Sequence, residues 1–173
     1  MSKFRRIADA GDLTGKTALV RVDLNVPMDG DTVTDKTRID AAKPTIDALM
    51  EAGARVALLA HFGRPKGVHV EDMSLHRLRP SIASVFGRPV SFADDCTGDA
   101  AKSAIAGLPE NGIILLENTR FHPGEEQGDQ SLARGMAALG DIYVNDAFSV
   151  SHREHASTAV IARHLPAKAG RWR

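Results

Sequence analysis

The segment VALLAHFGRPKG, residues 56–67, joins an apolar run to three basic side chains, His61, Arg64 and Lys66. An apolar run of this length is typical of a strand that is covered on both faces. Basic groups at its end either face solvent in a turn or bind an anion. Arginine favours the second use, because its planar guanidinium binds a phosphate or a carboxylate through two parallel hydrogen bonds.

Polar or basic side chains also follow three other apolar runs of the chain. They are Asp23 and Asn25 after the run 17–23, Arg120 after the run 112–118, and His152, Arg153 and His155 after the run 141–146, while Arg21 lies inside the first run and Arg38 opens the helical pattern that follows it. Taken singly, each of these residues is more simply a turn residue or a solvated charge. In open parallel sheets, however, ligands bind beyond the carboxyl ends of the strands. The repetition at four strand ends therefore predicts an anion site on one rim, suited to a ligand with phosphate, carboxylate and hydroxyl groups.

Short strand-like runs alternate with longer helical patterns along the chain. The expected strands are 17–23, 54–60, 89–93, 112–118 and 141–146, and the expected helices are 37–52, 74–86, 98–107, 129–140 and 157–165. Asp29-Gly30 predicts a tight turn, Pro44 a kink or break, and Ser74 a helix cap. The alternation predicts an α/β fold, with an open parallel β-sheet and helices on both faces, a Rossmann-like three-layer sandwich. We expect it to form one substrate-binding domain over residues 1–173.

The composition is that of an ordinary globular protein and excludes several classes. Hydrophobic residues make up 43% and charged residues 25% of the 173 residues, and 22 Lys plus Arg balance 22 Asp plus Glu. Zero net charge argues against broad binding to nucleic acid or an anionic membrane. A single cysteine allows no disulfide within the chain, and no signal peptide or membrane-spanning run is evident, so we expect a cytoplasmic protein.

Other chemistries fit the residue spacing less well. His152 and His155 lack further ligands nearby, and a calcium loop counted from Asn25 places a proline and a lysine where oxygen ligands belong, so we expect no metal site. A phosphatase with Asp23 as nucleophile usually has a second acid two residues later, where Asn25 stands. Cys96 has no cationic neighbour in the sequence that would activate its thiol. No P-loop or G-x-G-x-x-G nucleotide motif occurs.

Seven segments of the chain closely resemble the amino-terminal domain of phosphoglycerate kinase. They are RVDLNVP (21–27), TDKTRI (34–39), PTIDAL (44–49), HFGRPKG (61–67), LLENTRFHPGEE (115–126), YVNDAF (143–148) and SHREHAS (151–157). They occur in the family's order and cover nearly the whole chain. The departures from the family's pattern are at Phe62, Thr119 and residues 149–151, and none of them replaces a charged contact.

The resemblance implies a substrate, an activity and a set of site residues. In that family the amino-terminal domain binds 3-phosphoglycerate or 1,3-bisphosphoglycerate, and the carboxyl-terminal domain binds the magnesium complex of ADP or ATP, for phosphoryl transfer in glycolysis. The implied substrate contacts are Asp23, Asn25, Arg38, His61, Arg64, Arg120 and Arg153, with Arg21, His152 and His155 in the surrounding basic patch. Arg38 is the implied catalytic residue, since in the family it helps to stabilise the transferring phosphoryl group.

The family would continue beyond residue 173 into its nucleotide domain. We therefore expect this chain to supply the substrate half of a phosphotransferase, to bind no nucleotide cofactor itself and to be inactive alone. We also expect a monomer without nucleic-acid or membrane partners. The alternative is a non-catalytic module that binds phosphorylated metabolites. An apolar surface near Trp172 would favour the first reading.

Overall fold

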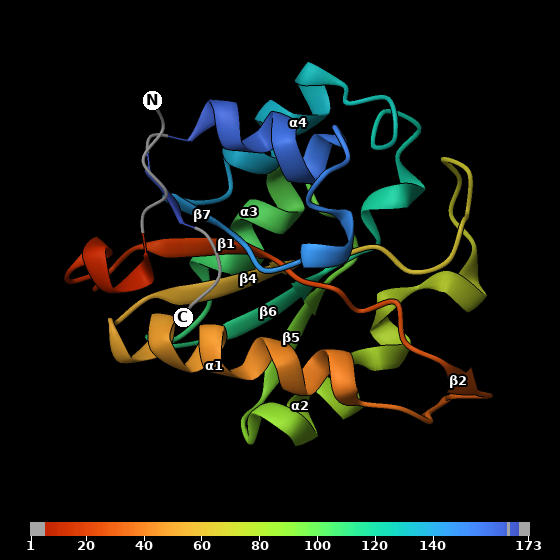
Figure 1. Ribbon diagram of the computed structural model, residues 1–173, viewed down its shortest axis with the longest axis horizontal. Coiled ribbons are helices and arrows are strands. Elements are labelled where there is room, and N and C mark those ends of the chain that lie inside the picture. The colour runs from red at the N-terminus through yellow and green to blue at the C-terminus, as the bar shows by residue number, and fades with distance from the viewer. Residues whose placement is uncertain (1–5, 166, 170–173) are drawn as a thin grey trace.

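In a computed structural model, which describes residues 6–165 and 167–169, six parallel strands form one sheet (Figure 1). The strands are β1 (Thr17–Arg21), β4 (Arg55–Leu59), β5 (Val90–Ala93), β6 (Ile113–Leu116), β7 (Ile142–Asn145) and β8 (Ala167–Ala169), in the spatial order β5-β6-β4-β1-β7-β8. All their pairings are parallel. The predicted α/β fold with a parallel sheet is confirmed.

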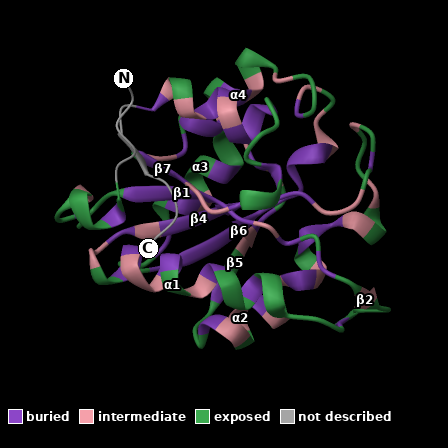
Figure 2. Cartoon of the chain, in the orientation of Figure 1, coloured by how far each residue is buried: buried purple, intermediate pink, exposed green. Residues whose placement is uncertain are grey.

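Two layers of helices cover the sheet. The helices α1 (Thr37–Glu51) and α2 (Arg79–Phe86) lie on one face, and α3 (Asp99–Ala106) and α4 (Gln130–Ala137) lie on the other (Figure 1). Successive strand residues point to opposite faces. Val20 of β1 therefore packs into the α1–α2 core, and its neighbour Leu19 packs into the α3–α4 core. The strands are buried throughout their length in the middle of the sheet, as Figure 2 shows.

The connections place a topological switch point beside β1. The chain passes from β1 through α1 to β4 on one side, and returns much later from β6 through α4 to β7 on the other. Crossovers that leave in opposite directions open a crevice at the carboxyl ends of the strands they connect. Arg21 and the loop after it lie at that crevice. A small antiparallel ribbon of β2 (Met28–Asp29) and β3 (Thr32–Val33) extends beyond it and contains the predicted Asp29-Gly30 turn.

The helix boundaries agree with the sequence patterns at most positions. The Ser74 hydroxyl accepts a hydrogen bond from the His76 N–H, but the turn that it caps is a 3-10 segment, η3 (Leu75–Leu78), which leads into α2. Gly87 ends α2 with φ +68°, in the left-handed region that favours glycine. A kink or break was expected at Pro44, but α1 continues through it without a break. Its ring is exposed, so water can satisfy the carbonyl that loses its partner, while buried Ile46 and its neighbours hold both halves to the sheet.

The chain departs from expectation near its end. The helix predicted over 157–165 is a π-helical turn, η6 (Ala156–Val160), followed by a 3-10 turn, η7 (Ile161–His164). Two hydrogen bonds to Glu125 set this geometry. The Ala156 N–H donates to the Glu125 carbonyl, and the Ser157 N–H donates to the Glu125 carboxylate. The edge strand β8 was not predicted. Trp172 lies outside the described residues. Among the described helices, none is long and apolar enough to cross a membrane.

Leu49→Ala tests the α1 interface with the sheet. Leu49 is fully buried in the α1–α2 core, so its truncation should lower the free energy of unfolding by about 2–5 kcal/mol. Val68→Ala is the matched control, because Val68 is 58% exposed and should change stability by no more than about 0.5 kcal/mol. Urea unfolding followed by circular dichroism measures both. Equal effects for the two variants would contradict the packing described here.

Candidate anion-binding site

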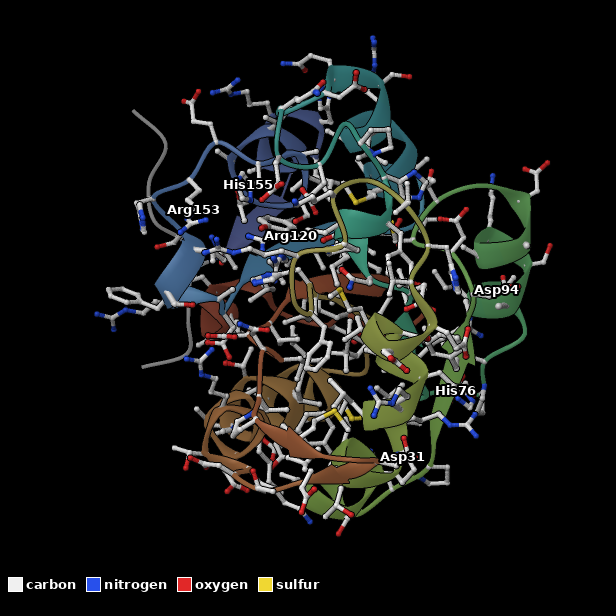
Figure 3. The ribbon with its side chains drawn as sticks, turned by 90° about the vertical axis from the view of Figure 1, so that its right-hand side faces the viewer. Asp31, His76, Asp94, Arg120, Arg153 and His155 are labelled. Carbon is white, nitrogen blue, oxygen red and sulfur yellow. The ribbon has the colours of Figure 1, made fainter. Side chains whose placement is uncertain are left out.

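The carboxyl rim of the sheet gathers most of the predicted site residues. Figure 3 views this rim face on, with Arg120, Arg153 and His155 close together and Asp94 on the far side of the rim. The basic residues arrive on separate elements. Arg21 ends β1, His61 and Arg64 follow β4, Arg120 lies in the 3-10 turn η4 (Thr119–Phe121) after β6, and Arg153 and His155 follow β7. The shared rim therefore brings together charges that are far apart in the sequence.

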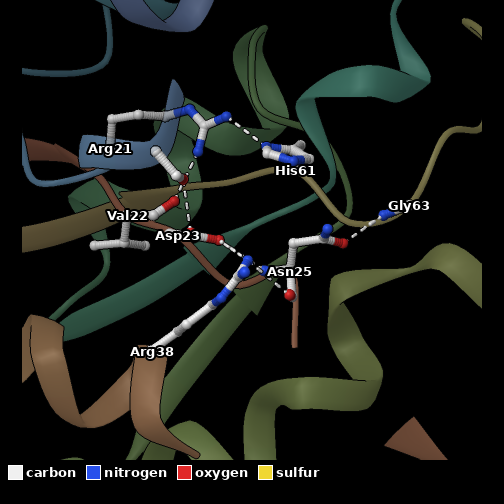
Figure 4. Close-up of polar contacts among 8 residues, drawn as sticks. Arg21, Val22, Asp23, Asn25, Arg38, His61 and Gly63 are labelled. Atoms are coloured by element: carbon white, nitrogen blue, oxygen red, sulfur yellow. Dashed lines mark hydrogen bonds and ion pairs between the residues drawn. The ribbon is translucent and has the colours of Figure 1, made fainter. Parts of the chain in front are cut away.

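Arg21 is the most deeply buried charge of this group, with no exposed surface. Its guanidinium donates to the Val22 carbonyl at 2.7 Å and to His61 Nδ1 at 2.8 Å (Figure 4). A third hydrogen bond runs to the Ser157 hydroxyl at 2.9 Å. Burial lowers the pKa of this guanidinium, and the charge of Glu125 opposes that shift. Arg21 therefore lies beneath the rim as an internal support. Its predicted place in the surrounding basic patch is thus a buried one.

His61 is held as a neutral ring by the same contact. A guanidinium has no acceptor, so Nδ1 of His61 must accept the bond and the ring proton must sit on Nε2. Burial, followed by the charges of Arg21 and Arg120, lowers the pKa of His61 from 6.5 to about 3. At neutral pH His61 thus contributes an N–H donor and no charge. It can bind an anion only through that single donor.

Asp23 and Arg38 form an ion pair at the mouth of the crevice. Arg38 Nη1 lies 3.1 Å from Asp23 Oδ1 and also donates to the Asn25 carbonyl at 3.0 Å (Figure 4). The Ser149 hydroxyl donates to Asp23 Oδ2 at 2.7 Å. Burial favours a higher pKa for Asp23, but the bonds from Ser149, the Asn25 N–H and Arg38 together lower it. Asp23 is therefore an ionised acceptor that already has partners, and about half of the Arg38 side chain remains exposed.

The loop after β4 is fixed by contacts on both sides of the Gly63 peptide unit. The Gly63 N–H donates to Asn25 Oδ1 at 3.0 Å (Figure 4). The Gly63 carbonyl accepts from Arg120 Nη1 at 3.0 Å. Gly63 has φ +63°, which a side chain would strain. The amide oxygen of Asn25 and part of the Arg120 fork are thus used to shape the loop. What the clamped loop presents to solvent is the next side chain, Arg64.

Arg64 and Arg153 are the rim arginines that remain open to a ligand. Both side chains are exposed, and neither has a hydrogen bond or an ion pair with any residue in the described part of the chain. Burial lowers the pKa of Arg120, Glu126 opposes the shift, and both Arg153 and Arg64 add to it. These three cations are therefore close enough to repel one another. A bound anion would relieve that repulsion.

The two remaining predicted histidines have different surroundings. His155 is 8% exposed, and its Nδ1 is buried without a hydrogen-bond partner among the described residues. Burial lowers the pKa of His155, and the Glu125 carboxylate opposes that shift. His152 is exposed and makes no hydrogen bond or ion pair within residues 6–165. The structure thus places His155 under the rim and leaves His152 at its outer edge.

Two clefts open on the carboxyl rim. One, of about 120 Å³, is lined by Asp23, Arg38, Ala41, Ala42, Asp146, Phe148 and Ser149. The other, of about 300 Å³, is lined by Lys66, Gly67, Arg120, His122, Pro123, Glu126 and Gln127. A cleft of about 390 Å³ at the opposite end of the strands includes Lys43, Asp47, Glu51 and Arg88. Its charges balance and Lys43 is already paired with Asp47 at 2.6 Å, so it is the weaker anion site despite its volume.

Several supporting residues were missed by sequence reasoning. Asn118 donates to the Phe62 and Met73 carbonyls and accepts from the Arg120 N–H, which fixes η4 against the loop after β4. Glu125 and Ser157 support Arg21 from below. Asn118, Glu125 and Ser157 all lie inside segments that resemble the family, but nothing in the sequence shows that these residues support the rim.

The fold and the rim define the class of protein, which is a doubly wound α/β domain with a basic crevice at the switch point of its sheet. The particular family follows from comparison with known proteins. The family model described as phosphoglycerate kinase matches residues 7–172, and the chain belongs to that family.

Individual relatives agree with this assignment. Phosphoglycerate kinase of Methylorubrum extorquens (strain PA1) is 57% identical over 99% of this chain, and that of Ruegeria sp. (strain TM1040) is 60% identical over 94%. Among solved structures, phosphoglycerate kinase from Coxiella burnetii aligns with a TM-score of 0.85 at 34% identity, over 96% of this chain and 41% of its own. The chain covers 43% of the Methylorubrum protein and 41% of the Ruegeria protein. It therefore spans about two fifths of the length of these relatives.

The low pKa of His61 predicts a loss of stability in acid. An unfolded chain protonates His61 near pH 6.5, whereas the folded protein resists protonation until about pH 3. The titration of His61 should therefore not change the free energy of unfolding above about pH 6.5. It should lower that free energy progressively as the pH falls from 6.5 toward 3. By pH 5 this amounts to as much as about 2 kcal/mol.

His61→Gln should remove that part of the pH dependence, because a glutamine oxygen can accept from Arg21 without titrating. Urea unfolding at pH 7.5 and pH 5 measures it, with His69→Gln as the control for an exposed histidine. An unchanged acid loss in His61→Gln would contradict the neutral, arginine-bound state of the ring.

Proposed function

We propose that this chain is the substrate-binding part of a phosphoglycerate kinase and binds 3-phosphoglycerate or 1,3-bisphosphoglycerate at its carboxyl rim. The observation that carries the proposal is a pair of exposed arginines, Arg64 and Arg153, close to the buried cation Arg120. Neither of the two exposed side chains has a hydrogen bond or an ion pair among the described residues, whereas Arg120 has Glu126 as an ion-pair partner at 3.6 Å. The mutual repulsion of the three cations is a cost that an anionic ligand offsets. Membership of the phosphoglycerate kinase family supports the choice of ligand.

Each rim residue has a role that its surroundings allow. Arg64, Arg120 and Arg153 hold the anionic groups of the substrate, since guanidinium forks match phosphate and carboxylate. Asp23 is the acceptor for a substrate hydroxyl, and a ligand would share or displace its Ser149 contact. His61 donates its Nε2–H as a neutral group. Asn25, Arg21 and His155 act by positioning these groups, and His152 stays peripheral.

Arg38 is the proposed catalytic residue. About half of its side chain is exposed at the crevice, and its Asp23 contact aims the guanidinium along the rim. A guanidinium placed at the transferring phosphoryl group stabilises charge that spreads over its oxygens in the transition state. We propose that Arg38 does this when the acyl phosphate of 1,3-bisphosphoglycerate faces the nucleotide.

The nucleotide side of the reaction is proposed to lie in the part of the relatives' length that this chain does not span. The rim residues do not fit a magnesium site. Asp23 has its two oxygens engaged by Arg38 and Ser149, and the surrounding groups are cations. Magnesium prefers carboxylate and water oxygens together with phosphates. We therefore assign the metal to the nucleotide, where it would neutralise the β- and γ-oxygens.

A non-catalytic module for phosphorylated metabolites is the second candidate. It rests on the same open arginines, Arg64 and Arg153. The two candidates differ in whether the anion site needs a second protein part for activity. A kinase half becomes active when the complementary part of a relative is supplied, whereas an independent module does not.

Binding of 3-phosphoglycerate is the first test. Calorimetric titration in low-salt buffer free of phosphate and sulfate should show one saturable site, with a dissociation constant from roughly tens of micromolar to millimolar. Arg64→Ala and Arg38→Ala should each weaken binding roughly 10- to 100-fold, because a hydrogen bond to a charged group contributes about 1.5–3 kcal/mol. Arg134→Ala, which removes an exposed arginine on α4, should leave it unchanged. Equal weakening by all three variants would show mere charge attraction and sink the proposed site.

Catalysis is the second test. The chain alone should give no turnover in a coupled assay with 3-phosphoglycerate and Mg-ATP, because phosphoryl transfer needs donor and acceptor aligned in one water-poor site. Fused to the carboxyl-terminal part of the Methylorubrum relative, it should become active, and Arg38→Ala in that fusion should reduce kcat. Normal turnover by the isolated chain would contradict the proposed division of the site.

A further inference from the structure

A second group of reactive side chains lies on the carboxyl rim at the β5–β6 edge. Asp95 and Cys96 follow β5, and His122 follows η4. One ligand-type atom from each, a carboxylate oxygen, the Cys96 sulfur and an imidazole nitrogen, lies within 4.8 Å of the other two. Neither the substrate contacts nor their supports proposed above include these residues.

Cys96 is the unusual member of this group. Its side chain is fully buried, yet its thiol has no hydrogen bond to any residue in the described ranges. The Cys96 sulfur therefore has no competing hydrogen bond among those residues and is available as a ligand beside the Asp95 and His122 atoms.

Asp95 and His122 complete the arrangement from the solvent side. His122 Nε2 donates to Asp95 Oδ1 at 2.7 Å, and the same oxygen accepts the Cys96 N–H at 2.7 Å. The His122 and Asp95 side chains are 31% and 44% exposed, so an ion can reach the cluster and the two side chains have room to rotate. His122 also lines the 300 Å³ cleft that contains Arg120.

We propose that Asp95, Cys96 and His122 form a site for one zinc-like divalent ion. Thiolate, imidazole and carboxylate are the three ligand types that zinc takes in proteins, and a solvent molecule would fill the fourth, open position. Tetrahedral zinc bonds of about 2.0–2.3 Å place ligand atoms about 3.3–3.8 Å apart. The Asp95 and His122 atoms, now 2.7 Å apart, must therefore separate as the ion enters. This site is independent of the proposed kinase function, and the expectation of a chain without a metal site is revised by it.

Binding changes the protonation of two ligands. The Cys96 thiol releases its proton to solvent, and its sulfur then forms the bond to the metal. The ring proton of His122 leaves Nε2, and Nδ1 takes one up from solvent, so that the Nε2 lone pair faces the ion. Asp95 loses the hydrogen bond from His122, and its carboxylate oxygen binds the ion instead. The net change is one proton released for each ion bound.

Cobalt(II) is the probe for the first experiment, because it substitutes for zinc and reports its ligands in its absorption spectrum. The untagged chain, reduced and freed of metal with a chelator, should bind one cobalt ion and develop thiolate-to-cobalt charge-transfer absorption in the near ultraviolet. Cys96 is the only cysteine of the chain, so that band assigns the thiolate ligand without any variant. One equivalent of zinc should abolish it. A titration that produces no such band would overturn the proposal outright.

Variants then test the other two ligands. His122→Gln and Asp95→Asn should each weaken cobalt binding at least about tenfold, since even partners outside the coordination shell are worth about 10–100-fold in metal affinity. His69→Gln, which removes another partly exposed histidine, should leave affinity unchanged. Circular dichroism shows whether each variant is folded. Folded variants at Asp95 and His122 that keep full affinity would refute the three-ligand site, even with the thiolate band present.

Discussion

A guanidinium buried at the carboxyl end of the inner strand β1 is the constraint on which this site depends. Arg21 has no exposed surface, and a charge in that position is tolerated only when its donors are matched. Its partners come from three parts of the chain: the Val22 carbonyl next to it, His61 at the end of β4, and Ser157 in the π-helical turn. Satisfying one buried charge therefore fixes the end of the neighbouring strand and the return of the chain after β7.

Two consequences reach the surface of the rim. The bond from Arg21 keeps His61 neutral and leaves its Nε2–H as a donor. The Asn25 and Arg120 bonds to Gly63 hold the following loop, and Arg64 projects from it into solvent without a side-chain partner among the described residues. Part of the basic rim is thus structural, and part is left open. Because the buried cations are held by hydrogen bonds and the exposed ones gather above them, a chain with no net charge presents a local cluster of cations.

Much of the fold could be predicted from the sequence, because strand and helix periodicities alternate cleanly and the apolar runs are long. The rim residues could be identified in advance, because they follow the predicted strands in the sequence. Which of them point outward could not be predicted, since burial of Arg21 and His155 depends on the distant Glu125 and Ser157. The π-helical turn was missed for a related reason: its backbone donors bind Glu125, a long-range contact that overrides local helix propensity.

The central claim is that the open cations of the carboxyl rim form one anion site. Amide chemical shifts in a nitrogen-15 labelled chain, followed as 3-phosphoglycerate is added, test this most directly. We expect saturable shifts concentrated at Gly63, Arg64, Arg120 and Arg153, with none at the opposite cleft near Lys43 and Arg88. Shifts confined to the opposite cleft, or small changes spread over all surface cations without saturation, would contradict the account.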